Sequence, residues 1–267
     1  MYKKAYGIIE TLAPLHVGAT AGEETGNLNL IFRDQFTQTG IIPGSSIRGR
    51  FRAEMRQFLG ETDTNQWYGS EAEMGKPDST SESFVKFEYA SIIWLPVFCP
   101  GQPMVWVTCP RLLKRYQRIA GISNPIPAVY TGSKTLNALN INGKNTLFFN
   151  FGFLTIDKTE DLKPWFPNGQ ELPGVVVGDD EISMIHDMAL YRQSRVALDK
   201  QEKKVSKGAF FNTEALPEET FLVFAIAIRP TTQTWEPFMG DEEAEVYLGG
   251  LESIGFGHCK ITLKGVK

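Results

Sequence analysis

Short apolar runs bounded by turn residues alternate along this chain with two segments whose apolar residues follow helical spacing. The runs at 6–9, 104–108 and 221–228 have the length and composition of strands. The helical segments open at Pro43-Gly44-Ser45-Ser46 and at Cys109-Pro110. The order strand, helix, strand, strand, helix, strand, strand is that of a split βαββαβ pattern with additions. We therefore expect an α+β, modified ferredoxin-like fold, with an antiparallel sheet and helices on one face.

The rest of the chain fits a single domain, 1–267, with two insertions. The segment 61–83 is polar and has few apolar anchors, and 121–180 is broken by prolines and glycines, so we expect insertions there. Residues 194–211 predict a β-hairpin with a polar tip. The acidic segment 236–247 is expected to be helical.

Composition excludes several classes of protein. The chain is 42% hydrophobic and 22% charged, values of a globular protein, which rules out disorder, collagen and coiled coil. We find no apolar run long enough to span a membrane and no secretion signal at the start. The odd count of three cysteines indicates reduced, buried thiols in a cytoplasmic protein. The net charge of 27 − 31 = −4 shows that any nucleic-acid site depends on local clusters of positive charge.

The first helix start has the residue types of a phosphate site. Ser45 or Ser46 is the expected N-cap, and Gly44 allows a ligand to approach the backbone N–H groups. Arg48 and Arg52 project from the same helix, which is expected to end at Gly60. The alternative is an ordinary capped helix with a solvated arginine face. The expected core stripe comprises Ile47, Phe51, Met55, Phe58 and Leu59.

A glycine-rich loop precedes the last predicted strand and permits close approach of another backbone. It lacks the Gly-Lys-Ser/Thr of a P-loop, and the element after it is a strand, which excludes a Rossmann fingerprint. The alternative is a pair of tight turns. The glycines concerned are Gly249, Gly250, Gly255 and Gly257.

The hairpin tip and one histidine complete the candidate groups. Lys200, Lys203 and Lys204 at the tip are either solvated or suited to wedge between stacked bases beside apolar walls. His16 is the histidine placed at the start of a long loop, where chemistry takes place most readily. No catalytic triad is supported by the sequence.

Several strings together resemble the RAMP superfamily of CRISPR-associated proteins. They are Leu15-His16-Val17-Gly18, the Ile42-Pro43-Gly44-Ser45-Ser46-Ile47-Arg48-Gly49-Arg50-Phe51-Arg52 segment, and the loop from Gly249-Gly250 to Gly255-Phe256-Gly257. Three further stretches, around 94–97, 105–113 and 208–217, are most similar to the repeated backbone subunit of type III-B (Cmr) effector complexes.

The resemblance implies an RRM-type palm with a β-hairpin thumb at about 194–211. It implies guide crRNA and target RNA as partners, together with copies of the chain in a helical filament and other CRISPR effector subunits, and no membrane. The guide contacts would fall on Gly44, Ser45, Ser46, Arg48 and Arg52. In this family, a loop aspartate with Mg²⁺ or another divalent metal cuts the target RNA at regular intervals, and no tightly bound cofactor is predicted.

The chain departs from this pattern at the loop position of the cutting aspartate, where Asn27 stands. An amide neither accepts a proton nor holds a metal as a carboxylate does. The neighbouring catalytic candidates are Glu24, Asp34 and His16. Three hypotheses follow: an endoribonuclease subunit that binds the guide, a non-cleaving RNA-binding scaffold, or a nucleotide-using small-molecule enzyme on a ferredoxin-like fold.

Overall fold

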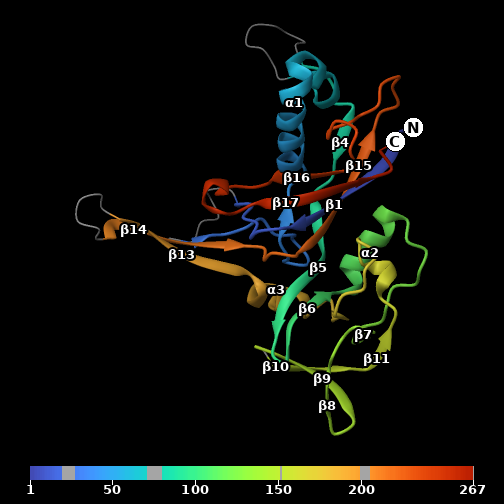
Figure 1. Cartoon of the computed structure of the whole chain (residues 1–267), viewed down its shortest axis with the longest axis vertical. Coiled ribbons are helices and arrows are strands. Elements are labelled where there is room, and N and C mark those ends of the chain that lie inside the picture. The colour runs from blue at the N-terminus through green and yellow to red at the C-terminus, as the bar shows by residue number, and fades with distance from the viewer. Residues whose placement is uncertain (20–27, 71–79, 151, 199–204, 267) are drawn as a thin grey trace.

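The computed structural model describes residues 1–19, 28–70, 80–150, 152–198 and 205–266. Within them, the strands form one 11-stranded mixed sheet and two three-stranded sheets (Figure 1). The fold is therefore mixed α+β, as the sequence predicts.

Four antiparallel strands form the centre of the large sheet, in the order β5-β15-β1-β17. Because side chains alternate along a strand, Ile9 and Phe224 face one side of this centre while Ile8 and Val223 face the other. The sheet thus separates two apolar clusters. The bounds are β1 Lys3–Thr11, β5 Ala90–Cys99, β15 Phe221–Ile228 and β17 His258–Lys264.

Helix α1 (Gly44–Tyr68) covers the first side, where Phe51 packs against Phe224 with ring centroids 6.2 Å apart. The first helix is interrupted at Gly60 as expected, since the φ of +76° and ψ of −178° of this residue are not helical, but a second helix follows it directly and was not expected. The continuation is stabilised because Trp67 and Tyr68 are buried, so the polar segment 61–83 is not wholly an insertion.

The predicted core stripe of this helix is correct in its first three members and wrong in its last two. Phe58 and Leu59 are 38% and 39% exposed, because they lie where the helix has passed beyond the sheet.

Helix α2 (Pro110–Ala120) lies on the opposite side of the sheet, where Leu113 and Tyr116 pack in the cluster that contains Ile8. The expectation of helices on one face is therefore wrong. The second face is also covered by Trp165, whose carbonyl accepts a hydrogen bond from the Trp94 indole N–H at 2.8 Å. A short turn of 3-10 helix, Lys163–Trp165, carries that residue.

The inserted segment 121–180 extends the large sheet instead of standing apart from it. Strand β12 pairs with β6 in parallel, and β7 and β11 continue the sheet beyond β12, while β8, β9 and β10 form a sheet of their own at the lower end in Figure 1. The bounds are β6 Gln102–Thr108, β7 Thr131–Ser133, β8 Leu139–Ile141, β9 Lys144–Phe149, β10 Gly152–Ile156, β11 Lys158–Glu160 and β12 Gly174–Val176.

The predicted hairpin is present and longer than expected, with β13 (Tyr191–Leu198) antiparallel to β14 (Val205–Ala215). It projects from the body of the molecule (Figure 1). Its base follows α3 (Ile182–Ala189), and β2 (Leu28–Asn29) pairs in parallel with β14.

The acidic segment 236–247 is not helical: β16 (Glu243–Tyr247) forms an edge strand beside β17. The residues of this strand pair in antiparallel register with those of β17, and a helix at the same positions could not form this pairing. The remaining short elements are β3 Ile41–Ile42, β4 Val85–Phe87 and a 3-10 turn at Glu252–Ile254.

The three thiols are buried, as predicted, and burial raises the pKa of Cys109 and of Cys259 to about 12. In the part of the chain that the structure describes, no helix is both long and apolar enough to cross a membrane.

Candidate nucleic-acid interface

A hollow of about 460 Å³ lies where three predicted motifs meet. The loop after β1 contributes Val17 and Gly18, the start of α1 contributes Ser46 and Arg50, and the glycine-rich loop contributes Gly249. These segments are far apart in sequence, and the fold brings them to one place. We call this feature the α1 hollow.

The glycine-rich loop is attached to the loop after β1 by backbone hydrogen bonds. Gly250 N–H donates to the His16 carbonyl and Gly257 N–H to the Pro14 carbonyl, both at 2.9 Å. Gly249 has a φ of +79°, and a Cβ there would lie 2.2 Å from the His16 oxygen. Only glycine fits this contact without a shift of the backbone. Gly255 lies in the same loop and closes its 3-10 turn.

The start of α1 differs from the sequence expectation. Pro43 is the N-cap, with no side-chain capping bond, so the expected serine cap is wrong. Ser46 lines the α1 hollow and Ser45 is exposed. A Cβ on Gly44 would lie 2.6 Å from the Phe87 carbonyl oxygen, so this glycine allows α1 to approach β4 closely.

Two of the expected phosphate ligands bind the protein itself. Arg48 donates to the Tyr68 carbonyl, and Arg52, 8% exposed, donates to Asn65 Oδ1 at 2.9 Å. Both side chains therefore fasten the first half of α1 to its second half. The alternative of a solvated arginine face does not hold for Arg52, which is buried, while Arg48 is half-buried.

Arg50 is the arginine that reaches the α1 hollow, and it was not among the residues expected to bind phosphate. It forms an ion pair with Glu54 and lies 4.0 Å from Glu252 on the glycine-rich loop. The available signal was the spacing of Ser46, Gly49, Arg50 and Ala53, which places small and polar residues on one helical face.

Two catalytic candidates have structural partners. His16 is 7% exposed, and its Nδ1 lies 2.6 Å from the Glu214 carbonyl oxygen. Asp34 accepts hydrogen bonds from the N–H groups of Phe36 and Thr37 at 3.0 and 2.8 Å. Burial opposes ionisation of Asp34, but these hydrogen bonds outweigh it and lower its pKa. Asp34 thus holds a turn.

The other candidates lie outside the described residues: Glu24, Asn27, Lys200, Lys203 and Lys204. The described chain resumes at Leu28, which pairs with Asn212 on β14, so this end of the loop runs along the hairpin.

An ion network that the sequence did not reveal closes the base of the hairpin. Glu214, 2% exposed, lies 3.1 Å from Arg33 on one carboxylate oxygen and 3.1 Å from Arg192 on the other. Arg33 also binds Asp187 on α3. Hydrogen bonds from His186 and Arg33 lower the pKa of Asp187 to about 2. We call these four residues, Arg33, Asp187, Arg192 and Glu214, the hairpin-base network.

His186 lies next to Asp187 of this network. It is fully buried and its Nε2 accepts the Gly40 N–H at 2.9 Å, which requires a neutral ring. Burial lowers its pKa, which agrees with that state. The residues that form the network come from four separate segments, and their contact with one another could not be read from the sequence.

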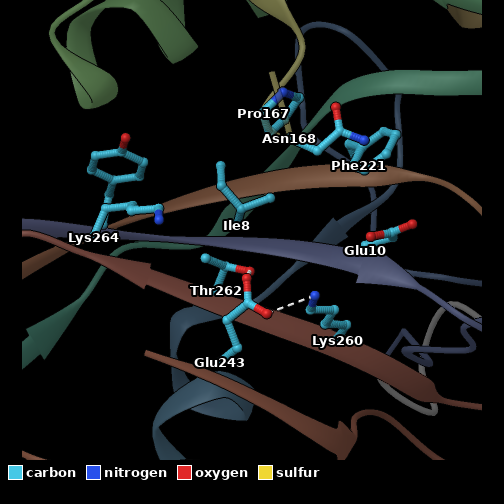
Figure 2. A pocket seen from close by; sticks show the side chains of 10 residues that line it. Ile8, Glu10, Pro167, Asn168, Phe221, Glu243, Lys260, Thr262 and Lys264 are labelled. Atoms are coloured by element: carbon cyan, nitrogen blue, oxygen red, sulfur yellow. Dashed lines mark hydrogen bonds and ion pairs between the residues drawn. The ribbon is translucent and has the colours of Figure 1, made fainter. Parts of the chain in front are cut away.

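A second hollow, of about 350 Å³, lies on the sheet face formed by β1 and β17 (Figure 2). Its charges largely neutralise one another: Lys260 pairs with Glu243 at 2.7 Å, and Thr262 donates to the same carboxylate at 3.0 Å. Burial raises the pKa of Glu10 at its edge. The charges that line this hollow balance, as Arg50 and Glu252 do at the α1 hollow, so net charge alone does not distinguish the two hollows.

No group of three or more His, Cys, Asp or Glu side chains within the described ranges is placed to hold a metal ion.

Comparison with known proteins agrees with the motifs that surround the α1 hollow. The family model of the RAMP superfamily matches residues 8–260, and the chain belongs to that superfamily. It is 23% identical over 292 residues to the CRISPR system Cmr endoribonuclease Cmr4 of Pyrococcus furiosus, covering 98% of this chain and 97% of that protein.

Solved structures show the same fold. The type III-B Cmr-beta complex bound to cognate target RNA contains a chain that superimposes with a TM-score of 0.73 at 19% identity, over 97% of this chain and 96% of that one. Oligomeric Cmr4 from Pyrococcus furiosus gives a TM-score of 0.68 at 19% identity, with 98% of each chain covered.

Proposed function

We propose that this chain is the crRNA-binding backbone subunit of a type III-B CRISPR RNA-targeting complex. The observation that carries the proposal is the meeting of three motifs around the α1 hollow, in a chain that belongs to the RAMP superfamily. Target RNA, further copies of the chain and other effector subunits would be its partners, in line with the relatives named as Cmr4 and Cmr complexes. With its three unpaired thiols, the complex would act in the cytoplasm.

The centre of the sheet supports an RRM-type palm. Strands β1 and β5 flank β15, and α1 lies between β1 and β5 in sequence, which is the split βαβ arrangement. The segment 229–257 stands where the second palm helix would be, and it holds β16 and the glycine-rich loop. The hairpin β13–β14 would be the thumb.

In this interpretation, Arg50 and the N–H groups of Gly44 and Ser45 hold guide phosphates, since the Ser46 N–H donates to the Pro43 carbonyl at 3.0 Å. The first N–H groups of a helix have no intrahelical partner and carry the positive end of its dipole. Gly249 and Gly250 allow the RNA backbone to approach the loop. The site recognises the backbone and therefore accepts guides of any sequence.

The test is RNA retention by the purified full chain. We expect absorbance at 260 nm from bound RNA and salt-sensitive binding of single-stranded RNA. Arg50→Ala should weaken binding and reduce the log–log salt slope by about 0.7, because one phosphate contact is lost. Arg56→Ala is the matched control, since Arg56 is exposed on the same helix outside the α1 hollow. Absence of RNA binding by the wild-type chain would instead leave the nucleotide-using enzyme as the better hypothesis.

A non-cleaving scaffold is the second candidate, and a specific observation favours it. Asn27 stands where the family's cutting aspartate is expected, and the carboxylates of Asp34 and Glu214 already bind groups of this chain. Neither is available as a base without loss of these contacts.

Asn27→Asp decides between cleavage and scaffold. A well-placed acid–base group is typically worth 10²–10⁴-fold in rate. We expect the substitution to raise magnesium-dependent cleavage of a labelled target RNA while guide affinity stays unchanged. Asn29→Asp is the matched control in the same segment. Wild-type cleavage abolished by Glu24→Ala would show that the acid has moved, and no cleavage by either aspartate variant would establish the scaffold.

A further inference from the structure

The segment 31–42 folds back on itself as a hairpin-like turn with an exposed aromatic ring at its tip. Ile41 N–H donates to the Phe32 carbonyl at 2.9 Å, and Asp34 N–H donates to the Thr39 carbonyl at 2.8 Å. Phe36 lies at the tip and is 72% exposed. Neither the core nor the α1 hollow uses this ring.

The turn is fixed in one conformation by Asp34. Its Oδ1 accepts from Phe36 N–H, from Thr37 N–H and from the Thr37 hydroxyl, the last at 3.0 Å. The Thr37 and Thr39 hydroxyls, both buried, bond to each other at 2.8 Å. The ring is therefore held out by a rigid base and loses little freedom when a ligand binds.

Helix α2 brings positive charge to the same place. The Arg111 guanidinium carbon lies 5.0 Å from the centre of the Phe36 ring, within cation–π range. Lys114, one turn further along, is exposed, and with Arg111 and Ile126 it lines a hollow of about 490 Å³. The two arginines that follow on this helix differ, because Arg115 and Arg118 both pair with Glu88.

The carboxylates beside this patch accept hydrogen bonds from backbone donors but keep their charge, so Asp34 and Asp179 offset the positive charge of Arg111 and Lys114 and leave stacking as the main attraction. Asp34 binds its own turn, and Asp179 accepts the Arg111 N–H at 2.9 Å. What remains for a ligand is an aromatic ring, a guanidinium plane and an ammonium group. This combination suits nucleobases, which stack on rings and on guanidinium planes, and the phosphates that join them.

We propose that Phe36, Arg111 and Lys114 form a second contact for single-stranded RNA, separate from the α1 hollow. The proposal rests on the proposed RNA-binding function and extends the path of the RNA. Phe32 lines the α1 hollow, and the path from Phe32 to Phe36 is shorter than the about 13 Å of four extended residues, because it ends in a turn. A strand of a few nucleotides that leaves the α1 hollow can thus pass the hairpin base and stack on Phe36.

The test compares variants of the full chain by fluorescence anisotropy with a labelled oligouridine long enough to cover both contacts. Stacking of a base on an aromatic side chain makes the expected loss of affinity for Phe36→Ala about 5- to 100-fold. Its salt slope should match the wild type, because no charge is removed, while Phe36→Trp should bind at least as well as the wild type. Phe98→Ala is the matched control, since Phe98 is 60% exposed elsewhere on β5.

Arg111→Lys supplies the second arm: it keeps the charge and removes the stacking plane, so affinity should fall with little change of slope. Cross-linking of 4-thiouridine RNA should label the peptide that contains Phe36.

If Phe36→Ala and Arg111→Lys bind as the wild type does, the proposal is wrong. A change of sedimentation with unchanged RNA affinity would assign the patch to a protein contact instead. Loss of RNA binding in Arg50→Ala but not in Phe36→Ala would keep the proposed function and overturn only this inference.

Discussion

Residues 28–42 contribute to both the α1 hollow and the hairpin-base network, and the charged side chains of the two sites differ in their burial. In the hairpin-base network, Glu214 is enclosed between Arg33 and Arg192, so the charges cancel inside the protein. At the α1 hollow, Arg50 is partly exposed and is held by acidic side chains on the rim. The comparison teaches that the two sites differ in the burial of their carboxylates: the side chain of Glu214 is 3% exposed, whereas those of Glu54 and Glu252, the partners of Arg50, are 25% and 45% exposed.

The same contrast exists within helix α1. Arg48 and Arg52 donate to Tyr68 and Asn65 beyond the kink, whereas Arg50 points into the α1 hollow. Three arginines at alternate positions of one helix therefore have two different roles.

Removal of the central carboxylate should have the largest effect. Glu214→Ala leaves two guanidinium groups without their common partner, and breaking a buried ion network in this way is strongly destabilising. Because both arginines are partly exposed, we expect a loss of roughly 2–4 kcal/mol in the free energy of unfolding, measured by urea denaturation. Glu245→Ala is the control: its pair with His258 is exposed and should change stability by less than about 1 kcal/mol. Equal losses of unfolding free energy would show that the burial of Glu214 does not strengthen the network.

Gly249→Ala tests how the α1 hollow is built. The new Cβ would meet the His16 oxygen at 2.2 Å on a backbone with a φ of +79°. We expect a loss of about 2–3 kcal/mol in unfolding free energy, together with weaker RNA binding. Gly250→Ala meets nothing within 4 Å and should stay within about 0.5 kcal/mol of the wild type. Thermal melting and RNA anisotropy measure both variants, and similar behaviour of the two would contradict this geometry.

Arg52→Ala and Arg50→Ala separate the two roles on α1. Arg52→Ala removes a buried charged hydrogen bond and should cost about 1.5 kcal/mol of unfolding free energy. Arg50→Ala should leave stability within about 0.5 kcal/mol and weaken RNA binding instead. The measurement is a pair of denaturation curves beside a pair of binding curves. A stable Arg52→Ala with weakened RNA binding would return Arg52 to the phosphate site.

The smallest expected effect is a loss of stability at acidic pH. Burial holds the pKa of His186 below its ordinary value of 6.5. Just below pH 6.5 this side chain is therefore protonated in the unfolded chain and neutral in the folded chain. The contribution of this group is fully present above pH 6.5 and is lost as the pH falls through the lowered folded pKa. The slope is at most about 1.4 kcal/mol per pH unit. Urea midpoints of the wild type and His186→Gln at a series of pH values check it, and parallel curves would exclude His186 as the source.

Much of the fold could be predicted from local pattern. The strand 221–228 agrees with β15, and the hairpin agrees with β13–β14, because apolar period and turn residues determine both locally. The helix expected at 236–247 was wrong, because part of this segment is the edge strand β16. An edge strand takes its stability from its neighbour, here β17, which no local pattern reveals. The break at Gly60 was predicted, but the helix that follows it was not, since its stability depends on the burial of Trp67 and Tyr68 in the tertiary structure.

By itself, the sequence determined that the chain is a mixed α+β protein, that a helix opens in the Pro43-Gly44-Ser45-Ser46 segment, and that a glycine-rich loop precedes the last strand. It also determined the resemblance to the RAMP superfamily, because motifs are properties of neighbouring residues. Only the tertiary structure decided which arginine reaches the α1 hollow and which carboxylate seals the hairpin base. Arg33 and Glu214 are 181 residues apart, and their contact exists because the sheet and α3 place both in one low-dielectric site.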